Sequence, residues 1–395
     1  MESVIRQKID TIAECIFDRI QKSEDTSFGM YSGEFGQLLF LLYYSKYSQN
    51  EKHELLIENY AERLLEHCVY KENIHSYCSG IAGILYLFEF LRKNQIIDLD
   101  IHHVQLVFDN YLIYKMRLDM QQRHFDFMHG AMGVGLYFLK RKTNPEYIHE
   151  LVDFLYDTAE KDDEKQTFKW ESVVDYEKNL PGYNLALSHG ITSIIIFLSR
   201  VITSGILNEK IREMLSGAVN YVLLQQKDFS QFGSNFPNYI PKNSSGVLSK
   251  SRMAWCYGDL GIGLALWQVG LSLGKEEWRQ RGFEILLQST QRRTYQESSV
   301  IDAGICHGSS GITMIYRRMF FETHCDEFKR AIPYWISQTL DLSRYDDGLA
   351  GYKSLIKDQW KCDYSLLTGI SGIGLVLLSY LEDDQQDWDE LFLLS

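Results

Sequence analysis

The sequence predicts an all-α fold in which seven helical hairpins close into a double ring, an (α/α) toroid. Three observations predict this fold. A short glycine motif recurs seven times along the chain, and an apolar run follows each copy. Amphipathic stretches separate the copies. Glycine is plentiful, with 28 residues, whereas proline is scarce, with five, and this balance favours many helices with glycine at their ends.

Each motif consists of two glycines three residues apart, directly before an apolar run. The first glycines of the copies are Gly33, Gly80, Gly130, Gly190, Gly258, Gly308 and Gly369. Intervals of 47 to 68 residues between them mark a repeated supersecondary unit. The fourth copy differs, because Ser193 stands in place of its second glycine. Since glycine lets the backbone turn tightly and approach a neighbour, a buried helix is expected to begin at each motif.

The stretches between the motifs predict a second, outer helix in each repeat. In the first of them, one helical face carries Ile5, Ile9, Ile12, Ile16 and Ile20. Each repeat is therefore a hairpin of an amphipathic outer helix and an apolar inner helix. Such hairpins either close into a ring or stack as an open solenoid. The lack of polar terminal caps favours closure.

Two segments interrupt the repeats. Residues 161–182 contain the strand-like run TFKWESVV and are expected to form a small insertion. Residues 227–251 are polar, contain Pro237 and Pro241, and are expected to form a long loop. Neither segment has the character of a linker, so residues 1–395 are predicted to form a single domain.

The composition excludes several classes of partner. The formal charge is −13, and no basic block occurs, which argues against nucleic acid and anionic membrane surfaces. The most apolar runs, 35–44 and 191–202, are shorter than the roughly 18 residues of a membrane-spanning helix. The first residues lack the apolar stretch of a secretory signal, and an odd number of cysteines, seven, is unlike a disulfide framework. The chain is therefore expected in the cytoplasm, either free or at a membrane-bound biosynthetic complex.

The residues directly before the first glycines carry most of the chemistry. Cys256 precedes Tyr257 in the fifth copy, and Cys306 precedes His307 in the sixth. Equivalent positions of a closed ring face one cavity, so these side chains are expected to converge. Two cysteines and one histidine suit zinc, and three protein ligands leave a fourth position open, as in catalytic sites. The alternative is that both cysteines are buried packing residues.

Three further residues share this position in the repeat. His189, in the fourth copy, is expected to face the same cavity. Cys78 has no neighbouring ligand and is interpreted as structural, and His129 as a packing or supporting residue. Two thiolates already neutralise a zinc ion, which favours activation of a substrate thiol, whereas hydrolases more often use histidine and carboxylate ligands. The ligand set therefore indicates addition to, or alkylation of, a thiol.

The motifs RMAWCYG (252–258), ICHG (305–308) and LSHG (187–190), placed on glycine repeats, resemble the lanthionine synthetase C family, the lantibiotic cyclases. The resemblance covers nearly the whole chain. It implies a helical toroid with a zinc ion in its cavity. It also implies addition of cysteine thiols to dehydroalanine or dehydrobutyrine of a dehydrated precursor peptide, which makes lanthionine or methyllanthionine rings. A separate dehydratase and an export transporter are the further partners that it suggests.

By motif, the resemblance also assigns the site. The zinc ligands are Cys256, Cys306 and His307, the catalytic residues are His189, Asp126 and Arg252, and Trp255 and Tyr257 shape the cavity. His189 is the expected proton carrier, because its ordinary pKa lies near neutrality. Asp126 is expected to orient His189 or to take the thiol proton, and Arg252 fits either an enolate oxygen or a salt bridge. Ser193 and Asp259 depart from the family pattern, so the cavity floor is expected to differ near them.

Two other functions fit parts of the sequence. Zinc-dependent prenyltransferases also alkylate a thiolate inside a helical toroid, and Asp383, Asp384 and Asp387 have a D-D-x-x-D spacing. These aspartates lie in a polar run after the last repeat, so we interpret them as a solvated acidic tail. The second alternative is a non-catalytic protein that binds a thiol such as glutathione through zinc. The combination of His189 with Asp126 favours catalysis.

Overall fold

The computed structural model describes residues 1–22, 27–71, 74–97, 101–175, 179–206, 208–242, 248–383 and 387–395. These residues form two compact units, each with its own helical core. Unit 1 comprises residues 1–112 and 300–394, and unit 2 comprises residues 113–299 together with Ser395. The single domain stays a prediction.

An apolar inner helix begins one residue after each first glycine, as the motifs predict. The inner helices are α2 (Glu34–Ser48), α4 (Ile81–Lys93), α6 (Ala131–Arg141), α8 (Ile191–Thr203), α11 (Asp259–Leu273), α14 (Ser309–Thr323) and α16 (Ile370–Glu382). In α4, every residue from Ile81 to Leu91 is buried. A helix that is apolar on all sides is stable only when it is surrounded by protein.

Amphipathic outer helices alternate with the inner ones. They are α1 (Glu2–Lys22), α3 (Glu51–Lys71), α5 (His102–Gln121), α7 (Pro145–Thr158), α9 (Glu209–Leu224), α12 (Glu276–Ser289) and α15 (Asp326–Asp341). In α1, the buried face includes all five isoleucines that the sequence places on one side. The predicted hairpin of one outer and one inner helix is therefore confirmed.

A close approach of the backbone explains the first glycine of the motif. A Cβ at Gly80 would lie 2.1 Å from the carbonyl oxygen of Ile74, and one at Gly190 would lie 2.2 Å from that of Asn184. The chain before an inner helix therefore folds back against the start of that helix, and no side chain fits between them. The residues that carry the site chemistry lie in these tight loops.

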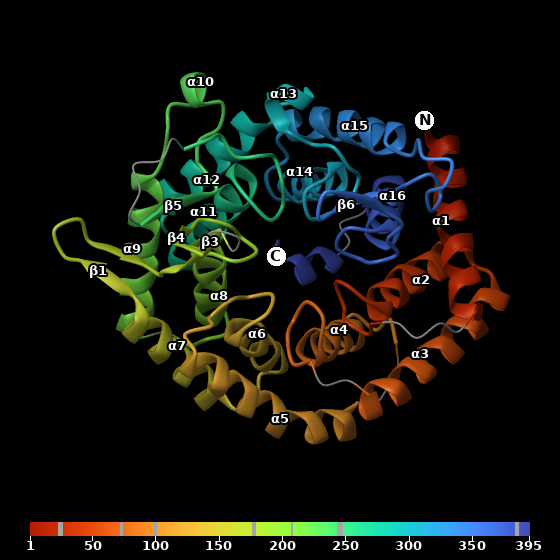
Figure 1. The fold of residues 1–395 in the computed structure, drawn as a ribbon, viewed down its shortest axis with the longest axis horizontal. Coiled ribbons are helices and arrows are strands. Elements are labelled where there is room, and N and C mark those ends of the chain that lie inside the picture. The colour runs from red at the N-terminus through yellow and green to blue at the C-terminus, as the bar shows by residue number, and fades with distance from the viewer. Residues whose placement is uncertain are drawn as a thin grey trace. The chain divides into compact units, whose positions relative to one another are not determined.

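Hydrogen bonds join equivalent positions of successive repeats in unit 1. The amide of Cys306 donates to the oxygen of Leu367 (2.9 Å), that of Leu367 to Tyr31 (3.0 Å), and that of Tyr31 to Cys78 (2.9 Å). These residues belong to the sixth, seventh, first and second copies, so the last repeat is bonded to the first. The helices α16 and α2 pack together, and Figure 1 shows them in blue and red. Such a pairing is required by a closed ring and is absent from an open solenoid.

Short strands occupy the two segments that interrupt the repeats. They are β1 (Glu160–Asp162), β2 (Thr167–Lys169), β3 (Ser172–Asp175), β4 (Leu180–Asn184) and β5 (Tyr239–Pro241). The first two pair antiparallel, and the other three form an antiparallel sheet in the order β3-β4-β5. The run TFKWESVV thus contributes two strands. The segment 227–251 is not wholly a loop, because it contains β5 and the short helix α10 (Phe229–Phe232), which Asp228 caps.

The remaining short elements are α13 (Tyr295–Ser298), β6 (Ser354–Ile356), β7 (Gln359–Lys361) and the 3₁₀ helix η1 (Asp387–Phe392). Asp383 and Asp387 are exposed, as the interpretation of a solvated acidic tail expects. The interpretation is wrong for the rest of η1. Trp388 and Asp389 are buried, and Asp389 forms an ion pair with the buried Arg318. The hydroxyls of Tyr31 and Tyr77 donate to the oxygen of Leu391.

Apolar side chains and these buried polar contacts therefore outweigh the acidic composition of η1. Of the D-D-x-x-D aspartates, Asp384 lies outside the described residues. None of the helices in the described part of the chain is long and apolar enough to cross a membrane.

Candidate active site

Unit 2 brings Asp126 and His189 together. Asp126 lies in the loop before α6, and His189 directly precedes Gly190 at the start of α8. The Nδ1 atom of His189 lies 2.7 Å from Oδ2 of Asp126. The other carboxylate oxygen of Asp126 accepts the backbone N–H of His129 (2.8 Å). Asp126 is thus held at both oxygens, and it holds the ring of His189.

Burial and ion pairing act in opposite directions on this pair. Burial tends to raise the pKa of Asp126, but the hydrogen bond and charge of His189 hold that pKa below its ordinary value. Burial tends to lower the pKa of His189, but the hydrogen bond and charge of Asp126 raise it above its ordinary value. The pair therefore favours a protonated His189. Since Nδ1–H is bound to Asp126, Nε2 is the ring atom suited to exchange a proton with a substrate.

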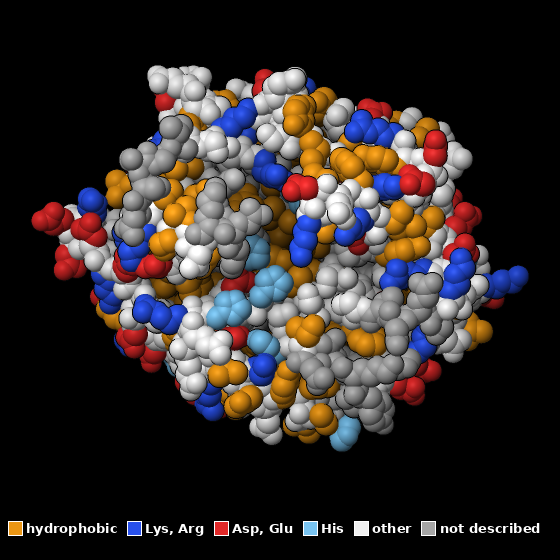
Figure 2. All heavy atoms as spheres, viewed as in Figure 1, with side chains coloured by type: hydrophobic (Ala, Val, Ile, Leu, Met, Phe, Trp, Pro, Cys, Tyr) orange, Lys and Arg blue, Asp and Glu red, His pale blue; other side chains and the backbone are white. Residues whose placement is uncertain are grey.

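His129 lies beside the pair. Its ring stacks on that of His189, with the ring centroids 5.8 Å apart and the planes inclined by 14°. Burial lowers the pKa of His129, and the charges of Asp126 and His189 then act on it in opposite directions. This position agrees with the supporting role expected from the sequence. On the face shown in Figure 2, histidine side chains gather next to acidic ones in the region that overlies α6 and α8.

Cys256 belongs to the same unit and is buried in the segment that leads into α11. Its carbonyl oxygen accepts the backbone N–H groups of Leu187 (3.0 Å) and Ser188 (3.3 Å). The hydroxyl of Ser188 also donates to this oxygen (3.3 Å). The segment that carries Cys256 is therefore bonded directly to the segment that carries His189.

The neighbours of Cys256 differ in their burial. Trp255 is fully buried and packs edge-on against Phe127, with ring centroids 6.4 Å apart. Arg252 and Tyr257 are half-buried. Trp255 thus packs against the loop that carries Asp126, because Phe127 directly follows Asp126 in the chain.

Unit 1 holds Cys306 and His307 in the loop before α14, and both are half-buried. The Nε2 atom of His307 lies 2.8 Å from Oδ2 of Asp302, a carboxylate that is itself buried. A carboxylate beside one ring nitrogen commonly supports a metal-binding histidine, because it keeps the proton on that nitrogen and the lone pair on the other.

Asp302 is not among the site residues expected from the sequence. Its signal is its spacing, six residues before Gly308, since the fold-back loop brings the carbonyl and carboxylate of that residue against the glycine. In each repeat, the residue six positions before the first glycine places its carbonyl oxygen against that glycine.

The donor types fit zinc. Cys256 is buried, Cys306 and His307 are half-buried, and thiolate and imidazole are the ligands that zinc prefers. Cys78, which shares their position in the repeat, is 5% exposed, and its carbonyl oxygen accepts the amide of Tyr31. This agrees with its interpretation as structural.

Comparisons with known proteins give a consistent result. The family model described as "Lanthionine synthetase C-like protein" matches residues 24–393. Nisin biosynthesis protein NisC of Lactococcus lactis subsp. lactis is 23% identical over 416 residues, which cover 95% of this chain and 92% of that protein. A solved structure of nisin cyclase superposes with a TM-score of 0.79 at 20% identity and covers 100% of this chain and 98% of its own.

The structural likeness confirms the predicted all-α (α/α) toroid, the fold of nisin cyclase. The family match spans the glycine repeats and includes the WCYG, CHG and SHG motifs. The chain therefore belongs to the lanthionine synthetase C-like family and is a cyclase of the lanthionine synthetase type.

Proposed function

We propose that this protein is a zinc-dependent peptide cyclase. Its substrate is a dehydrated precursor peptide, in which it joins cysteine thiols to dehydroalanine or dehydrobutyrine to form lanthionine or methyllanthionine rings. The observation that carries the proposal is the pair of Asp126 and His189, 2.7 Å apart, with His189 on a segment bonded to the carbonyl of Cys256. The names of the relatives, which tie them to nisin biosynthesis and cyclisation, support it.

Cys256, Cys306 and His307 are the proposed zinc ligands. Two thiolates and one imidazole are donor types that zinc prefers. When bound, zinc supplies a position at which a substrate thiol loses its proton and stays nucleophilic. The carboxylate of Asp302, 2.8 Å from Nε2 of His307, is the neighbour that would orient this ligand.

The chain's own residues handle the proton and the developing charge. In the addition, a sulfur–Cβ bond forms and the carbon–carbon double bond opens. The thiol gives up one proton and Cα takes up one, so the reaction needs no redox partner. His189 donates the proton to Cα from Nε2, and Asp126 orients the ring and stabilises its charge. Arg252 stabilises the enolate oxygen.

Incubation with a dehydrated precursor tests the function. Ring formation is an isomerisation, so the peptide keeps its mass while the number of thiols that iodoacetamide can alkylate falls. We expect this loss with the zinc-bound protein and a much slower loss without it.

Two outcomes would contradict the proposal. Retention of glutathione on the zinc-bound protein without ring formation supports the non-catalytic alternative. A gain in mass from a prenyl diphosphate supports the alkylating alternative.

The zinc ligands lead to a separate prediction. Metal analysis is expected to find about one zinc per chain, and Cys306→Ala is expected to lose it because two ligands cannot hold the ion. Cys325→Ala is the control, since Cys325 precedes α15 and its thiol donates to Glu327. A Cys306→Ala protein with full zinc content would overturn the ligand assignment.

The proposed partners are the precursor peptide, a separate dehydratase and an export transporter. The proposed location is the cytoplasm, either free or at a membrane-bound biosynthetic complex. Both proposals rest on the family resemblance.

A further inference from the structure

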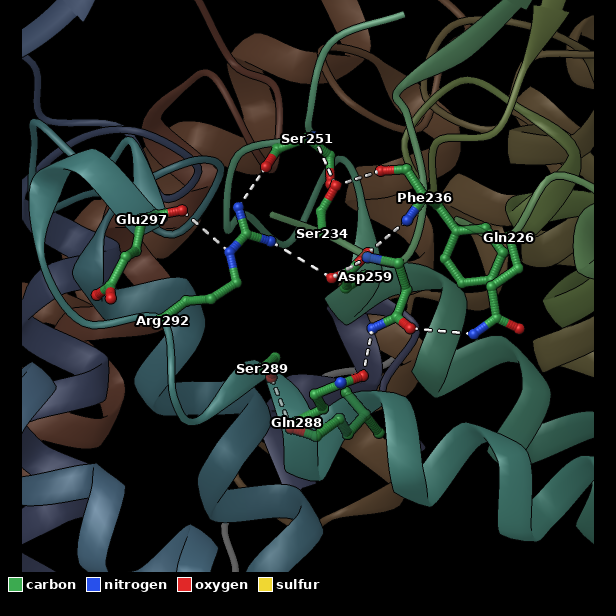
Figure 3. A network of polar contacts seen from close by, with 11 residues as sticks. Gln226, Ser234, Phe236, Ser251, Asp259, Gln288, Ser289, Arg292 and Glu297 are labelled. Carbon is green, nitrogen blue, oxygen red and sulfur yellow. Dashed lines mark hydrogen bonds and ion pairs between the residues drawn. The ribbon is translucent and has the colours of Figure 1, made fainter. Parts of the chain in front are cut away.

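We propose that Asp259 and Arg292 are positioning residues for Cys256, which they hold through a closed ring of hydrogen bonds. The ring consists of Asp259, Phe236, Ser234, Ser251 and Arg292, and Figure 3 shows it. We call it the Asp259 ring. The inference rests on the proposed function only where it treats Cys256 as a ligand.

Each member of the Asp259 ring bonds to the next. Oδ1 of Asp259 accepts the N–H of Phe236 (3.0 Å), whose oxygen accepts the hydroxyl of Ser234 (2.9 Å). The hydroxyl oxygen of Ser234 accepts the N–H of Ser251 (3.1 Å). The oxygen of Ser251 accepts a hydrogen bond from Arg292, whose Nη1 lies 3.4 Å from Oδ2 of Asp259. All five residues lie in unit 2.

The ring is buried, and its charges balance within it. Asp259 and Arg292 are 1% and 2% exposed. Burial raises the pKa of Asp259, whereas Arg292 and the amides of Asn235 and Phe236 oppose that rise. Removing one partner of such a pair leaves an uncompensated buried charge, which is strongly destabilising. The ring therefore resists local opening.

The two ends of the segment that carries Cys256 are both members of the ring. Ser251 lies at one end and Asp259 at the other. Between them, Gly258 has a φ of 80°, and a Cβ there would lie 2.5 Å from the hydroxyl oxygen of Ser251. The backbone of residues 252–258 is thus confined to one loop shape. Its two ends are tied together, and only glycine fits at position 258, where the chain turns back toward Ser251.

Two further bonds tie the loop and the Asp259 ring to α13. The amide of Met253 donates to the oxygen of Ser298 (2.8 Å), and Nε of Arg292 donates to the oxygen of Glu297 (3.0 Å). The carbonyl of Cys256 accepts the amide of Leu187, so a shift of the loop would also disturb the loop before His189. The ring therefore sets where the Cys256 thiol lies.

The test compares two aspartate variants of the full-length protein. Asp259→Asn keeps the size of the side chain but removes its charge and one acceptor. Asp389→Asn is the matched control, because it breaks the buried ion pair of Arg318 and Asp389 in unit 1. Melting temperatures are measured for both, and all comparisons are made at temperatures where each variant is folded.

The first readout is the alkylation rate of Cys256 after zinc removal, followed by peptide mass mapping. We expect Asp259→Asn to speed alkylation on the order of tenfold, which corresponds to about 1.4 kcal/mol of easier local opening. The alkylation rate of Cys306 should change by no more than about twofold. Asp389→Asn should leave the Cys256 rate unchanged although it lowers the melting temperature.

The second readout is cobalt substitution, which reports ligand geometry through the thiolate-to-metal absorption band. We expect a weaker or shifted band in Asp259→Asn and a native band in Asp389→Asn. Arg292→Gln should reproduce the Asp259→Asn result, and the double variant should add little, because both changes break one ring. Arg292→Lys is the milder substitute if Asp259→Asn does not fold.

An equal effect of Asp259→Asn and Asp389→Asn on Cys256 would overturn the inference and leave the ring a purely structural feature. A protein that binds no zinc but still shows the selective change at Cys256 would contradict the proposed function, whereas the positioning role would stand. The two failures are therefore distinguishable.

Discussion

At the scale of single residues, the carboxylate of Asp126 determines the charge on His189. Burial alone would lower the pKa of this histidine, and the carboxylate reverses that effect. A general acid is active only while it is protonated, so its contribution is lost as the pH rises through its pKa. The raised pKa therefore keeps His189 able to donate a proton up to a higher pH than an isolated histidine could.

Removal of the Asp126 carboxylate should move the alkaline limb of the pH–rate profile. In Asp126→Asn, burial of His189 remains while the opposing charge is lost, so we expect the pKa of His189 to fall and cyclisation to decline at lower pH. The measurement is the cyclisation rate across pH 5–9 with a dehydrated precursor. His189→Asn gives the rate without the acid, expected to be about 10²–10⁴-fold lower.

The control for this prediction is Asp119→Asn, which removes the carboxylate 3.4 Å from Nδ1 of His124. It should leave the alkaline limb in place. An unchanged limb in Asp126→Asn would show that another group donates the proton.

Which residues could be predicted follows from where their partners lie. Asp126 and His189 each stand at a fixed distance from a repeated glycine, so the sequence places them in equivalent loops. Asp259 stands out in the sequence only as a departure from a family pattern. Its partners, near residue 235 and at Arg292, come from separate segments of the chain. No local sequence pattern predicts that these segments contact one another.

At the scale of secondary structure, the start of each inner helix depends on a glycine that meets a carbonyl. Gly80 is a clear case, because a Cβ there would lie 2.1 Å from the oxygen and 2.5 Å from the carbon of the Ile74 carbonyl. A backbone atom cannot move aside as a flexible side chain can. A larger residue at Gly80 therefore forces the backbone of this loop to shift.

Gly80→Ala is expected to lower the free energy of unfolding by about 1–3 kcal/mol, the usual range for overpacking. Thermal and urea unfolding followed by circular dichroism would measure it. Gly205→Ala is the control, since a Cβ there meets no atom within 4 Å and only its positive φ opposes the change. A smaller loss at Gly80 than at Gly205 would contradict the carbonyl contact as the cause.

The length and periodicity of an element decide whether the sequence predicts it. The inner and outer helices have long, periodic patterns with glycine at fixed places, so the sequence predicts that an inner helix starts at each glycine motif. The strand β5 and the helix η1 are short, and each forms because a distant segment receives it: β4 pairs with β5, and Tyr31 and Tyr77 bind the backbone of η1. Acidic composition alone is therefore a poor guide to the burial of η1.

At the scale of the whole molecule, unit 1 is built from both ends of the sequence. Its first repeat receives a hydrogen bond from its last, and η1 is held by tyrosines that precede α2 and α4. Unit 2, apart from Ser395, is one continuous stretch of chain. Unit 1 therefore needs both ends of the chain to complete its core, whereas the core of unit 2 comes from neighbouring repeats.

Deletion of residues 387–395 should weaken the amino-terminal helices. We expect hydrogen exchange in α2 and α4 to quicken, because the deletion removes Trp388, the Arg318 partner and the acceptor of both tyrosines. Tyr77→Phe is the milder control, since it removes one hydrogen bond worth about 1 kcal/mol. Unchanged protection of α2 and α4 in the truncated protein would show that η1 contributes nothing to them.

The bond between the last repeat and the first has a consequence for biosynthesis. A ribosome releases the amino-terminal repeats long before the chain reaches Leu367, so the apolar face of α2 must wait for its partner α16. Unit 2 can gather its helices as they emerge, since their partners are close in sequence. Nascent chains stalled after residue 299 has left the ribosome, but before Leu367 is made, should therefore hold a folded core around Cys256 while the first helices are still protease-sensitive. Maturation of the enzyme then begins in its middle and ends where its two extremities meet.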